Sequence, residues 1–378
     1  MQPGGAQAQT FQTGAAQAIL MDAESGTVLF EKNADQLMVP ASMAKVMTVE
    51  VIAEEIRKGR LNDETAFVIS EYAWRTGGAP SRGSTMFAEL NSSIKLPDLL
   101  RGIIIHSGND ASIAAAEAIA GSEGAFARMM TLRARELGLP NSVFMNSTGY
   151  HDPDQVTTAR ELALLTLHFI RTSPEIYAMY GEEEFTWNGI RQRNRNPLLS
   201  MNIGADGVKT GYVAESGYGL IGSAVQLDQR LILVINGLPT AREREIEARR
   251  LLDWGFRAFE PRLLFEAGET VGEAQVFGGE KSYVGLVSDR PIQVLIPRGT
   301  NDRLTARIVY QGPLSPPVRE GTQVGVLRVM RGNSQALEQP LFAAEDVERG
   351  PLSRRAYDGL WELGAGAVRR AIFGSEGG

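Results

Sequence analysis

The sequence predicts an α/β protein followed by a small all-β domain and a C-terminal amphipathic helix. Between Ala18 and about Phe256, short apolar runs alternate with helical patterns, which is typical of α/β architecture. From about Glu260 to Phe342, β-branched residues alternate or cluster between turns, which is typical of a sandwich. At 378 residues the chain exceeds one typical domain. We therefore expect a flexible lead (1–17), an α/β domain (18–258), a β-sandwich (259–348) and an amphipathic tail (349–378).

The individual elements follow from the spacing of apolar residues. Buried-strand candidates in the α/β part are short apolar runs at 18–22, 27–30 and 231–235, and Ser25-Gly26 offers a turn between the first two. Apolar residues at helical spacing predict helices over 43–58, 96–105, 110–120, 125–136, 159–170 and 241–253. Strands of the all-β part are expected at 282–287, 292–296, 303–310 and 322–329.

Composition argues against several classes of function. The net charge of −7 argues against nucleic acid as a main partner, because a polyanion binds a basic face. Zero cysteines exclude a disulfide scaffold, a thiolate nucleophile and a thiolate metal site. No apolar run approaches the ~20 residues of a transmembrane helix. A signal peptide would show a basic and then an apolar region, and neither is present. The chain is therefore either cytoplasmic or a mature form preceded by an added Met1.

The C-terminal region predicts an amphipathic helix over 352–373, with Pro351 near its start. On a helical wheel, Arg355, Asp358, Glu362 and Arg369 lie opposite an apolar face that contains Tyr357 and Trp361. Arginines flank the ends, as in a helix that lies in the plane of a membrane surface. The same pattern also suits a helix that packs on the β domain. Its glycines weaken it as an isolated helix, so its folding is expected to need a surface.

The first chemical motif is Ser42-Met43-Ala44-Lys45, which follows Pro40 at the start of a helical pattern. Ser and Lys three residues apart share one face of a first helical turn, so the ammonium can reach the hydroxyl. A serine becomes a useful nucleophile when a base takes its proton, and Lys45 can be that base if its pKa falls toward neutrality. The helix N-terminus also supplies N–H groups for an oxyanion.

Two of the short motifs have matches elsewhere in the chain. Ser92-Ser93-Ile94-Lys95 repeats the Ser-x-x-Lys spacing, but Pro97 indicates that the helix begins after Lys95. Ser200-Met201-Asn202 repeats the Ser-x-Asn spacing, but no helical pattern follows it. Ser107-Gly108-Asn109 instead lies between two helical patterns, in a tight connection that can direct both side chains into one cleft.

The third motif, Lys209-Thr210-Gly211, predicts an edge strand that binds an extended peptide. Apolar neighbours indicate a strand, and Gly211 allows a ligand backbone to approach closely. Such a strand can pair with a peptide by β-addition and hold its terminal carboxylate. Arg244 can add a bidentate carboxylate contact, and Arg242 and Arg249 compete with it for that role.

The histidines do not indicate a catalytic triad or a metal site. A Ser-His-Asp triad needs a histidine that its neighbours orient toward the serine. His106 points away from Ser107 if the segment is extended, and His168 lies in a helical pattern. His151 is expected in a loop that borders the cleft. Scattered histidines do not supply convergent ligands, so we expect no metal and no cofactor.

Together, the ordered motifs Ser42-Met43-Ala44-Lys45, Ser107-Gly108-Asn109 and Lys209-Thr210-Gly211 resemble those of the penicillin-recognising serine enzymes. The chain is most similar to the low-molecular-mass penicillin-binding proteins that are D-alanyl-D-alanine carboxypeptidases. Further segments look like that subfamily, and so do the β domain and the amphipathic tail. These segments are 40–48, 107–111, 157–163, 194–196, 207–212, 244–252 and 254–255.

The resemblance implies a β-lactamase/transpeptidase-like fold, with an antiparallel sheet flanked by helices, and a role for each motif residue. Ser42 would attack the carbonyl between two D-alanines of a peptidoglycan stem peptide. Lys45 would accept the proton, Ser107 would relay it, and Asn109 would bind substrate and position Lys45. The remaining implied roles are terminal-carboxylate binding by Lys209, Thr210 and Arg244 beside Gly211, and an oxyanion hole from the N–H groups of Ser42 and Tyr212.

The resemblance further implies β-lactams as covalent inhibitors, no cofactor, and work in the periplasm on the outer face of the cytoplasmic membrane, with the C-terminal helix on the membrane surface. Tyr212 departs from the subfamily, since some relatives carry His there, so β-lactam affinity and deacylation rate stay open.

Two other functions fit the same motifs. A class A β-lactamase would also carry a Glu-x-x-Leu-Asn element, whereas Glu161-Leu162-Ala163-Leu164 is followed by Leu165. Nitrocefin turnover would identify that enzyme. A penicillin-binding scaffold of low turnover, acting through the β domain and tail, would keep every motif, because motifs do not measure rate.

Overall fold

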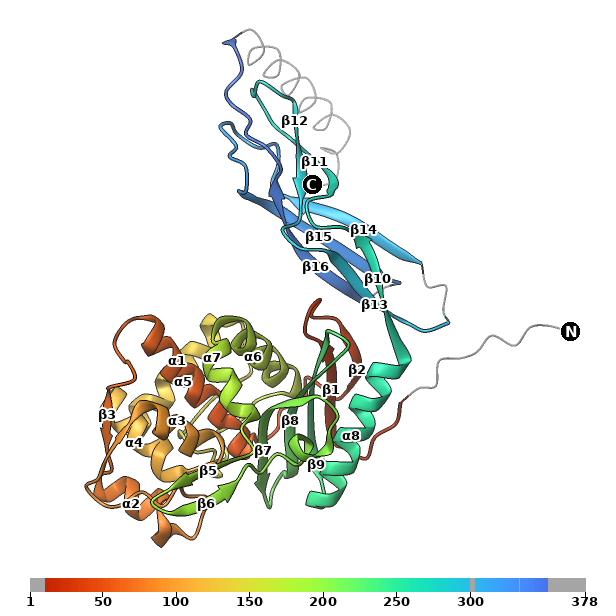
Figure 1. The fold of residues 1–378 in the computed structure, drawn as a ribbon. Coiled ribbons are helices and arrows are strands. Elements are labelled where there is room, and N and C mark those ends of the chain that lie inside the picture. Colours follow the sequence, from red (N-terminus) through yellow and green to blue (C-terminus); the bar gives the residue numbers. More distant parts are fainter. Residues whose placement is uncertain (1–10, 300–302, 333, 353–378) are drawn as a thin grey trace, which may run out of the picture. The chain divides into compact units, whose positions relative to one another are not determined.

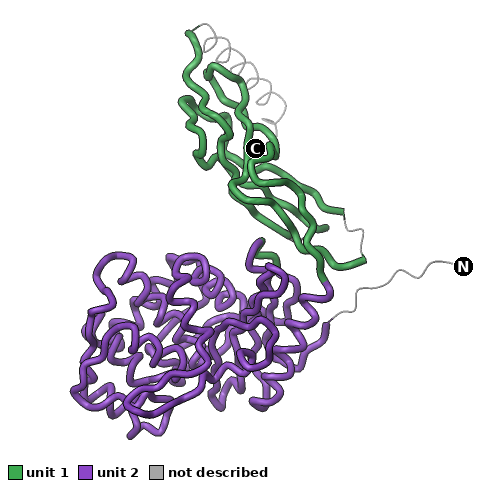
Figure 2. The backbone as a smooth tube through the Cα atoms, in the orientation of Figure 1, with its two compact units in different colours: residues 1–8, 25–27, 259–378 green, residues 9–24, 28–258 purple. Residues whose placement is uncertain are grey.

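The computed structural model describes residues 11–299, 303–332 and 334–352 of the chain. It divides into two compact units (Figure 2). One consists of residues 9–24 and 28–258, and the other of residues 1–8, 25–27 and 259–378. We call them the α/β unit and the β unit and describe each by itself.

An antiparallel sheet of five strands organises the α/β unit (Figure 1). The strand order is β2-β1-β9-β8-β7, so β7, which carries the Lys209-Thr210-Gly211 motif, is an edge strand as predicted. These strands are β1 (Gln17–Asp22), β2 (Val28–Lys32), β7 (Ala205–Val213), β8 (Gly217–Gln226) and β9 (Gln229–Leu238). The central strands are apolar on both faces, because helices cover the sheet on both sides.

Alternation along β1 shows how the two faces are used. Ile19 and Met21 belong to the cluster formed with the helical region. Leu20 faces the other way, where a Cβ on Gly255 of α8 would lie 2.6 Å from its side chain.

The helices are α1 (Lys45–Arg57), α2 (Glu71–Gly77), α3 (Leu96–Ile104), α4 (Asn109–Ala120), α5 (Glu123–Glu136), α6 (Ala159–Thr172), α7 (Pro174–Ala178) and α8 (Ala241–Ala258). The six predicted helices are therefore present, but α8 runs to Ala258, well beyond the predicted end at residue 253, whereas the other ends shift by about two residues at most.

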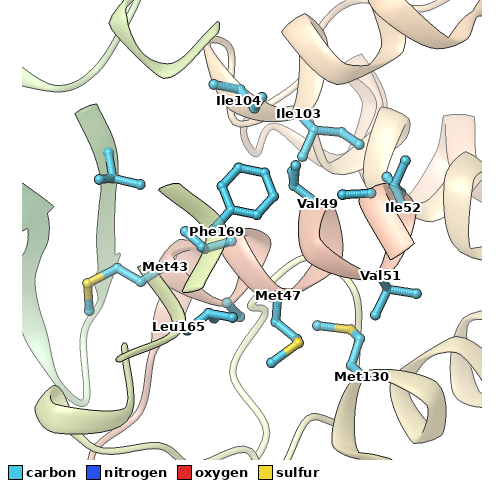
Figure 3. Packing of buried hydrophobic residues seen from close by; sticks show 14 of the residues in the cluster. Met43, Met47, Val49, Val51, Ile52, Ile103, Ile104, Met130, Leu165 and Phe169 are labelled. Atoms are coloured by element: carbon cyan, nitrogen blue, oxygen red, sulfur yellow. The ribbon is translucent and has the colours of Figure 1, made fainter. Parts of the chain in front are cut away.

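Helix α1 is the central element of the helical region. Its residues Met47, Val49 and Ile52 are fully buried and pack against side chains of α3, α5 and α6, such as Ile103, Met130 and Phe169 (Figure 3). Glu50 of the same helix is also buried and is held by Arg57 and Arg133. A helix fixed on every side provides a rigid support for the residues at its N-terminus.

Two short hairpins were not predicted. Strand β3 (Ala66–Val68) pairs with β4 (Ser93–Lys95), and β5 (Glu184–Trp187) pairs with β6 (Ile190–Arg193). The first hairpin contains most of the competing Ser-x-x-Lys match, residues 93–95. Ser92 precedes strand β4 rather than opening a helix, and Lys95 is exposed and paired with Glu64. Ser92 and Lys95 therefore do not form a nucleophile and base.

The described residues of the β unit form the predicted strands and three more. Its five-stranded sheet has the order β11-β12-β16-β15-β14, and β10 pairs with β13 in a second sheet of two strands. Both sheets contribute to one apolar cluster that includes Leu286, Val294 and Val329. The result is a β-rich near-barrel rather than two comparable sheets of a sandwich. The strands are β10 (Phe259–Phe265), β11 (Thr270–Gln275), β12 (Tyr283–Val287), β13 (Ile292–Pro297), β14 (Leu304–Tyr310), β15 (Gln323–Arg331) and β16 (Ser334–Ala343).

The predicted C-terminal helix lies outside the described residues, except for Leu352. The flexible lead is likewise outside them up to residue 10. Within the described ranges, none of the helices combines the length and the apolar character that a membrane span requires.

Candidate active site

Lys45 is the buried centre of a polar cluster in the α/β unit. The side chain is 1% exposed, and its Nζ atom donates to Asn109 Oδ1 at 2.7 Å and to the carbonyl oxygen of Thr148. The same Nζ lies 3.4 Å from Ser42 Oγ. The predicted nucleophile and base therefore meet, and Asn109 joins them from 64 residues away in the sequence.

Ser42 lies at the start of the long helix, as predicted, but in a 3₁₀ turn that runs directly into α1 and not in an α-helical turn. Residues Ala41–Ala44 form a 3₁₀ turn, and α1 begins at Lys45. The turn is packed tightly from two sides. A Cβ on Gly149, which has a φ of +81°, would lie 1.9 Å from the Ala41 carbonyl oxygen, and one on Gly211 would lie 2.9 Å from that of Pro40. Two close backbone approaches thus hold Ser42 and explain the left-handed φ of +48° at Ala41.

The Ser107-Gly108-Asn109 motif forms the predicted connection between α3 and α4. Ser107 has a φ of +58°, is 1% exposed, and its Oγ has no hydrogen-bond partner among the described residues. The backbone N–H of Asn109 donates to Ser84. A buried hydroxyl without a partner costs free energy, so the position of Ser107 is not explained by a hydrogen bond within the described residues.

The neighbouring residue Asp110 holds the segment that follows Ser84. Its carboxylate is fully buried and accepts hydrogen bonds from Thr85 Oγ1 at 2.6 Å and from the backbone N–H groups of Met86 and Ala88. The first turn of α4 is therefore tied to the loop that covers Asn109.

Lys209 and Thr210 lie on edge strand β7, where the chain lies against the Ser42 turn through Gly211. Both side chains are buried, at 3% and 6% exposed. Burial holds the pKa of Lys209 well below its usual value, and the positive charges of Lys45, Arg195 and Arg244 lower it further. This concentration of positive charge on one edge suits an anionic ligand.

The structure distinguishes Arg244 from its two competitors. The guanidinium of Arg244 is partly buried, lies 5.7 Å from the ring centre of Tyr218, and is close enough to lower the pKa of Lys209. Its Nε is buried without a partner among the described residues. Arg242 is exposed, and Arg249 lies 3.6 Å from Asp253. Arg244 is therefore the arginine of α8 that belongs to this cluster.

Tyr212 follows the motif on β7 and is half exposed, at 53%. Its ring lies 4.3 Å from that of Tyr218, centre to centre. Tyr218 in turn contacts Arg244, so a row of Tyr212, Tyr218 and Arg244 borders the Lys209 side of the cluster.

The environment of Lys45 suits a base. Burial lowers its pKa from 10.5 to about 7, and the positive charge of Arg195 contributes, while Asp110 and Glu123 act in the opposite direction. A lysine with a pKa near neutrality is partly uncharged at physiological pH and can accept a proton.

Sequence reasoning assigned no role to Thr148, Tyr150 or Arg195. Thr148 contributes a carbonyl to Lys45, and the Tyr150 hydroxyl accepts from Asn109 Nδ2 at 2.9 Å. Arg195 lowers the pKa of both lysines. For Arg195 a signal existed, because segment 194–196 was one of the subfamily-like stretches. For the other two, only the folded loop brings them to the site.

The histidines have other partners. His106 Nε2 bonds the Phe185 carbonyl oxygen at 2.9 Å, and burial lowers the pKa of this histidine. His168 lies 3.3 Å from Glu50, and His151 lies 3.9 Å from Glu215. In the described part of the chain, no group of acidic or histidine side chains is arranged to hold a metal ion.

The carboxylate of Glu161, the residue compared above with a β-lactamase element, is bound by the loop that precedes α6. Its carboxylate accepts from the Asn141 backbone at 2.8 Å and from the hydroxyl of Ser142. These contacts anchor α6 to the preceding loop.

Comparisons with known proteins agree across both units. The D-alanyl-D-alanine carboxypeptidase family matches residues 4–240, and the C-terminal domain of penicillin-binding protein 5 matches residues 259–349. The D-alanyl-D-alanine carboxypeptidase DacC of Escherichia coli K12 is 40% identical over 343 residues, which cover 90% of this chain and 86% of DacC. DacA of the same organism is 36% identical over 335 residues, covering 88% of this chain and 83% of DacA.

Solved structures show the same architecture. Penicillin-binding protein 5 from Haemophilus influenzae superposes with a TM-score of 0.79 at 36% identity, covering 90% of this chain and 99% of that one. Penicillin-binding protein D2 from Listeria monocytogenes, in its cefotaxime-bound form, matches 65% of this chain and 99% of its own with a TM-score of 0.57 and 26% identity.

Fold and site together define a serine enzyme of the penicillin-binding class with a C-terminal β-rich domain. Within that class, the chain belongs to the D-alanyl-D-alanine carboxypeptidase family and is a serine-type D-Ala-D-Ala carboxypeptidase.

Proposed function

We propose that this enzyme removes the terminal D-alanine from peptidoglycan stem pentapeptides through an acyl-enzyme on Ser42. The observation that carries the proposal is the Lys45 amine, which is buried, has a pKa of about 7 and lies 3.4 Å from Ser42 Oγ. This pairing supplies the base that a serine nucleophile requires. The same reaction with β-lactams would stall at the acyl stage. Binding of a β-lactam is seen in a similar protein, the cefotaxime-bound penicillin-binding protein D2.

The hydrogen bonds of Lys45 would direct its lone pair toward Ser42. A neutral amine has two N–H bonds and one lone pair. Asn109 Oδ1 and the Thr148 carbonyl oxygen are two acceptors for the two N–H bonds. The lone pair then remains for the Ser42 hydroxyl proton. As Ser42 Oγ attacks the carbonyl carbon, the proton moves to Lys45 Nζ.

Ser107 would pass the proton to the leaving D-alanine. Its hydroxyl is buried next to Asn109 and has no partner in the described part of the free protein, so it is available when substrate enters. Protonation of the leaving amine lets the C–N bond break and leaves the acyl group on Ser42. Water then attacks the ester and releases the shortened peptide.

The remaining site residues would bind the charged parts of the substrate. Lys209 and Thr210 would hold the terminal carboxylate, and Arg244 would reinforce them, because Lys209 and Arg244 lie within electrostatic reach of each other on and beside β7. The N–H groups of Ser42 and Tyr212 would stabilise the oxyanion, which the close packing of Gly211 against the Pro40 carbonyl supports.

Release of D-alanine from a synthetic pentapeptide tests the proposal. We expect stoichiometric D-alanine and tetrapeptide from the wild-type protein. Acylation of Ser42 by penicillin without any D-alanine release would contradict the proposed turnover and favour a penicillin-binding scaffold. Rapid and sustained nitrocefin hydrolysis would favour a β-lactamase instead.

The domain division and location belong to the same proposal. Residues 18–258 carry catalysis, and residues 259–348 form a spacer or interaction module. Residues 349–378 bind the outer face of the cytoplasmic membrane as an in-plane helix, and residues 1–17 are an N-terminal lead. The supporting pattern is the amphipathic sequence with arginines at its ends. Deletion after Pro351 should keep activity and remove binding to liposomes that contain anionic lipid. Unchanged liposome binding would contradict the anchor.

A further inference from the structure

Asn109 can serve Lys45 only in one orientation of its side-chain amide. The carbonyl oxygen Oδ1 now faces the Lys45 amine at 2.7 Å. If the amide rotated by 180°, its NH₂ group would face Lys45 instead. A neutral amine would accept that N–H through its lone pair, and the lone pair would no longer be available for the Ser42 proton.

The hydroxyl of Tyr150 selects the productive orientation. It has one proton, which it donates to the Thr76 carbonyl oxygen at 2.8 Å. Toward Asn109 it can therefore only accept, and it accepts from Nδ2 at 2.9 Å. The NH₂ group of the amide is thus held on the Tyr150 side and Oδ1 on the Lys45 side.

Tyr150 is itself half-buried and fixed by its loop. Its carbonyl oxygen accepts from the side-chain amides of Asn146 and Gln155, both at 3.0 Å. A Cβ on Gly83 would lie 3.2 Å from the Tyr150 hydroxyl and 3.1 Å from Asn109 Nδ2, so backbone at residue 83 lies close to this hydrogen bond. The same loop supplies the Thr148 carbonyl to Lys45, so one short segment fixes both acceptors of the amine.

We infer that Tyr150 is a positioning residue, whose hydroxyl locks the Asn109 amide so that the lone pair of Lys45 stays directed at Ser42. The inference rests on the proposed role of Lys45 as base. Tyr150 lies behind Asn109 and acts through it.

The test is Tyr150→Phe, which removes only the hydroxyl. We expect the second-order rate of acylation by a fluorescent penicillin to fall about 10- to 100-fold at its plateau, because a buried donor loses its partner and the amide can turn. The acidic limb of the pH–rate profile should also move to lower pH. The turned amide would donate to the neutral Lys45 amine and stabilise it, which lowers the pKa of Lys45. Lys45 faces the same charges in both proteins, namely those of Arg195, Lys209, Asp110 and Glu123.

The matched control is Tyr310→Phe, which deletes a hydroxyl that accepts from the Gln275 backbone in the β unit. It should acylate like wild type. Each acylation rate is normalised to the fraction of protein that is labelled after long incubation with the penicillin. Unfolded protein in a preparation therefore does not lower the measured rate. A Tyr150→Phe protein with the plateau acylation rate and the acidic limb of the wild-type protein would overturn the inference. So would a slower protein whose limb does not move, since that marks a merely structural role.

A double-mutant cycle makes the test independent of folding. The carboxylate of the Asn109→Asp variant has no N–H to present to Lys45, but its negative charge raises the pKa of Lys45. Each pair of rates is therefore compared at the plateau above the acidic limb of its own background. We expect Tyr150→Phe to cost no more than about threefold in the Asn109→Asp background. An equal cost in both backgrounds would contradict the inference. D-alanine release by the wild-type protein is measured in parallel, so that failure of the proposed function is recognised separately.

Discussion

The α/β unit and the β-rich segment 259–352 bury polar groups in opposite ways. The α/β unit buries two lysines, Lys45 and Lys209, together with the unpartnered hydroxyl of Ser107. In the described part of segment 259–352, the buried polar side chains are Ser288 and Gln339, which bond to each other. Burying a charge costs several kcal/mol unless it is compensated. The α/β unit therefore carries buried polar groups that cost folding free energy, whereas the buried polar pair described in segment 259–352 satisfies itself.

The largest effect should come from the nucleophile. Ser42→Ala should lower D-alanine release from a pentapeptide by at least about 10⁴-fold, because no covalent intermediate can form. Ser92→Ala, at the competing Ser-x-x-Lys match, should keep nearly full activity. The measurement is enzymatic detection of free D-alanine. If Ser92→Ala lost activity and Ser42→Ala kept it, the assignment of Ser42 as the nucleophile would be wrong.

A core truncation in the β unit should change stability and leave chemistry intact. Leu286→Ala, at a fully buried position of β12, should lower the free energy of unfolding of that unit by about 2–4 kcal/mol. Penicillin acylation at 25 °C should stay at the wild-type rate. Urea unfolding followed by circular dichroism provides the first quantity. Val309→Ala, at a position 43% exposed, serves as the control and should change little. A large loss of acylation in Leu286→Ala would break the comparison between the two units.

Removal of Arg244 should weaken recognition of the terminal carboxylate. Arg244→Ala should lower kcat/KM for a peptide ending in D-Ala-D-Ala by about 10- to 100-fold, since a charge-assisted contact is lost. A substrate whose terminal carboxylate is amidated should show a much smaller change. Arg242→Ala, at an exposed position of the same helix, should resemble wild type. Equal losses for both substrates would place Arg244 outside the carboxylate site.

The pH profile tests Lys45 as the base. Because the pKa of Lys45 is about 7, acylation should be near its plateau above that pH and about tenfold lower one unit below it. Arg195 lowers that pKa, so Arg195→Ala should raise it and move the acidic limb to higher pH. Stopped-flow acylation between pH 5 and 9 measures the limb. Arg193→Ala, two residues away and exposed, is the control. If the acidic limb of the pH–rate profile did not move in Arg195→Ala, the limb would not reflect the pKa of Lys45.

Much of the fold could be predicted because apolar periodicity is strong in its helices and central strands. The predicted ends of α3 and α4 differ from the structure by one residue. The β5–β6 hairpin was missed because its residues are largely exposed and lack a buried face for the pattern to reveal. The edge position of β7 was correct, as was the start of a helix after Lys95.

At the site, sequence order identified the residues that converge but not the backbone that holds them. The sequence predicts that Ser42 opens the long helix, which is correct, but not that this first turn is 3₁₀ or that Gly149 and Gly211 pack closely against it. Thr148 and Tyr150 were missed because a carbonyl and a hydroxyl acquire their roles only when loop 146–150 folds beside Asn109. Contacts across such sequence distances depend on the tertiary structure.

Mass spectrometry of the penicillin-treated protein tests the central claim most directly. After digestion, one peptide should carry the mass of the ring-opened β-lactam, and fragmentation should place it on Ser42. The label should disappear in Ser42→Ala and persist in Ser92→Ala. An adduct on Ser92 or Ser107, or labelling that survives in Ser42→Ala, would contradict the assignment of Ser42 and Lys45 as nucleophile and base.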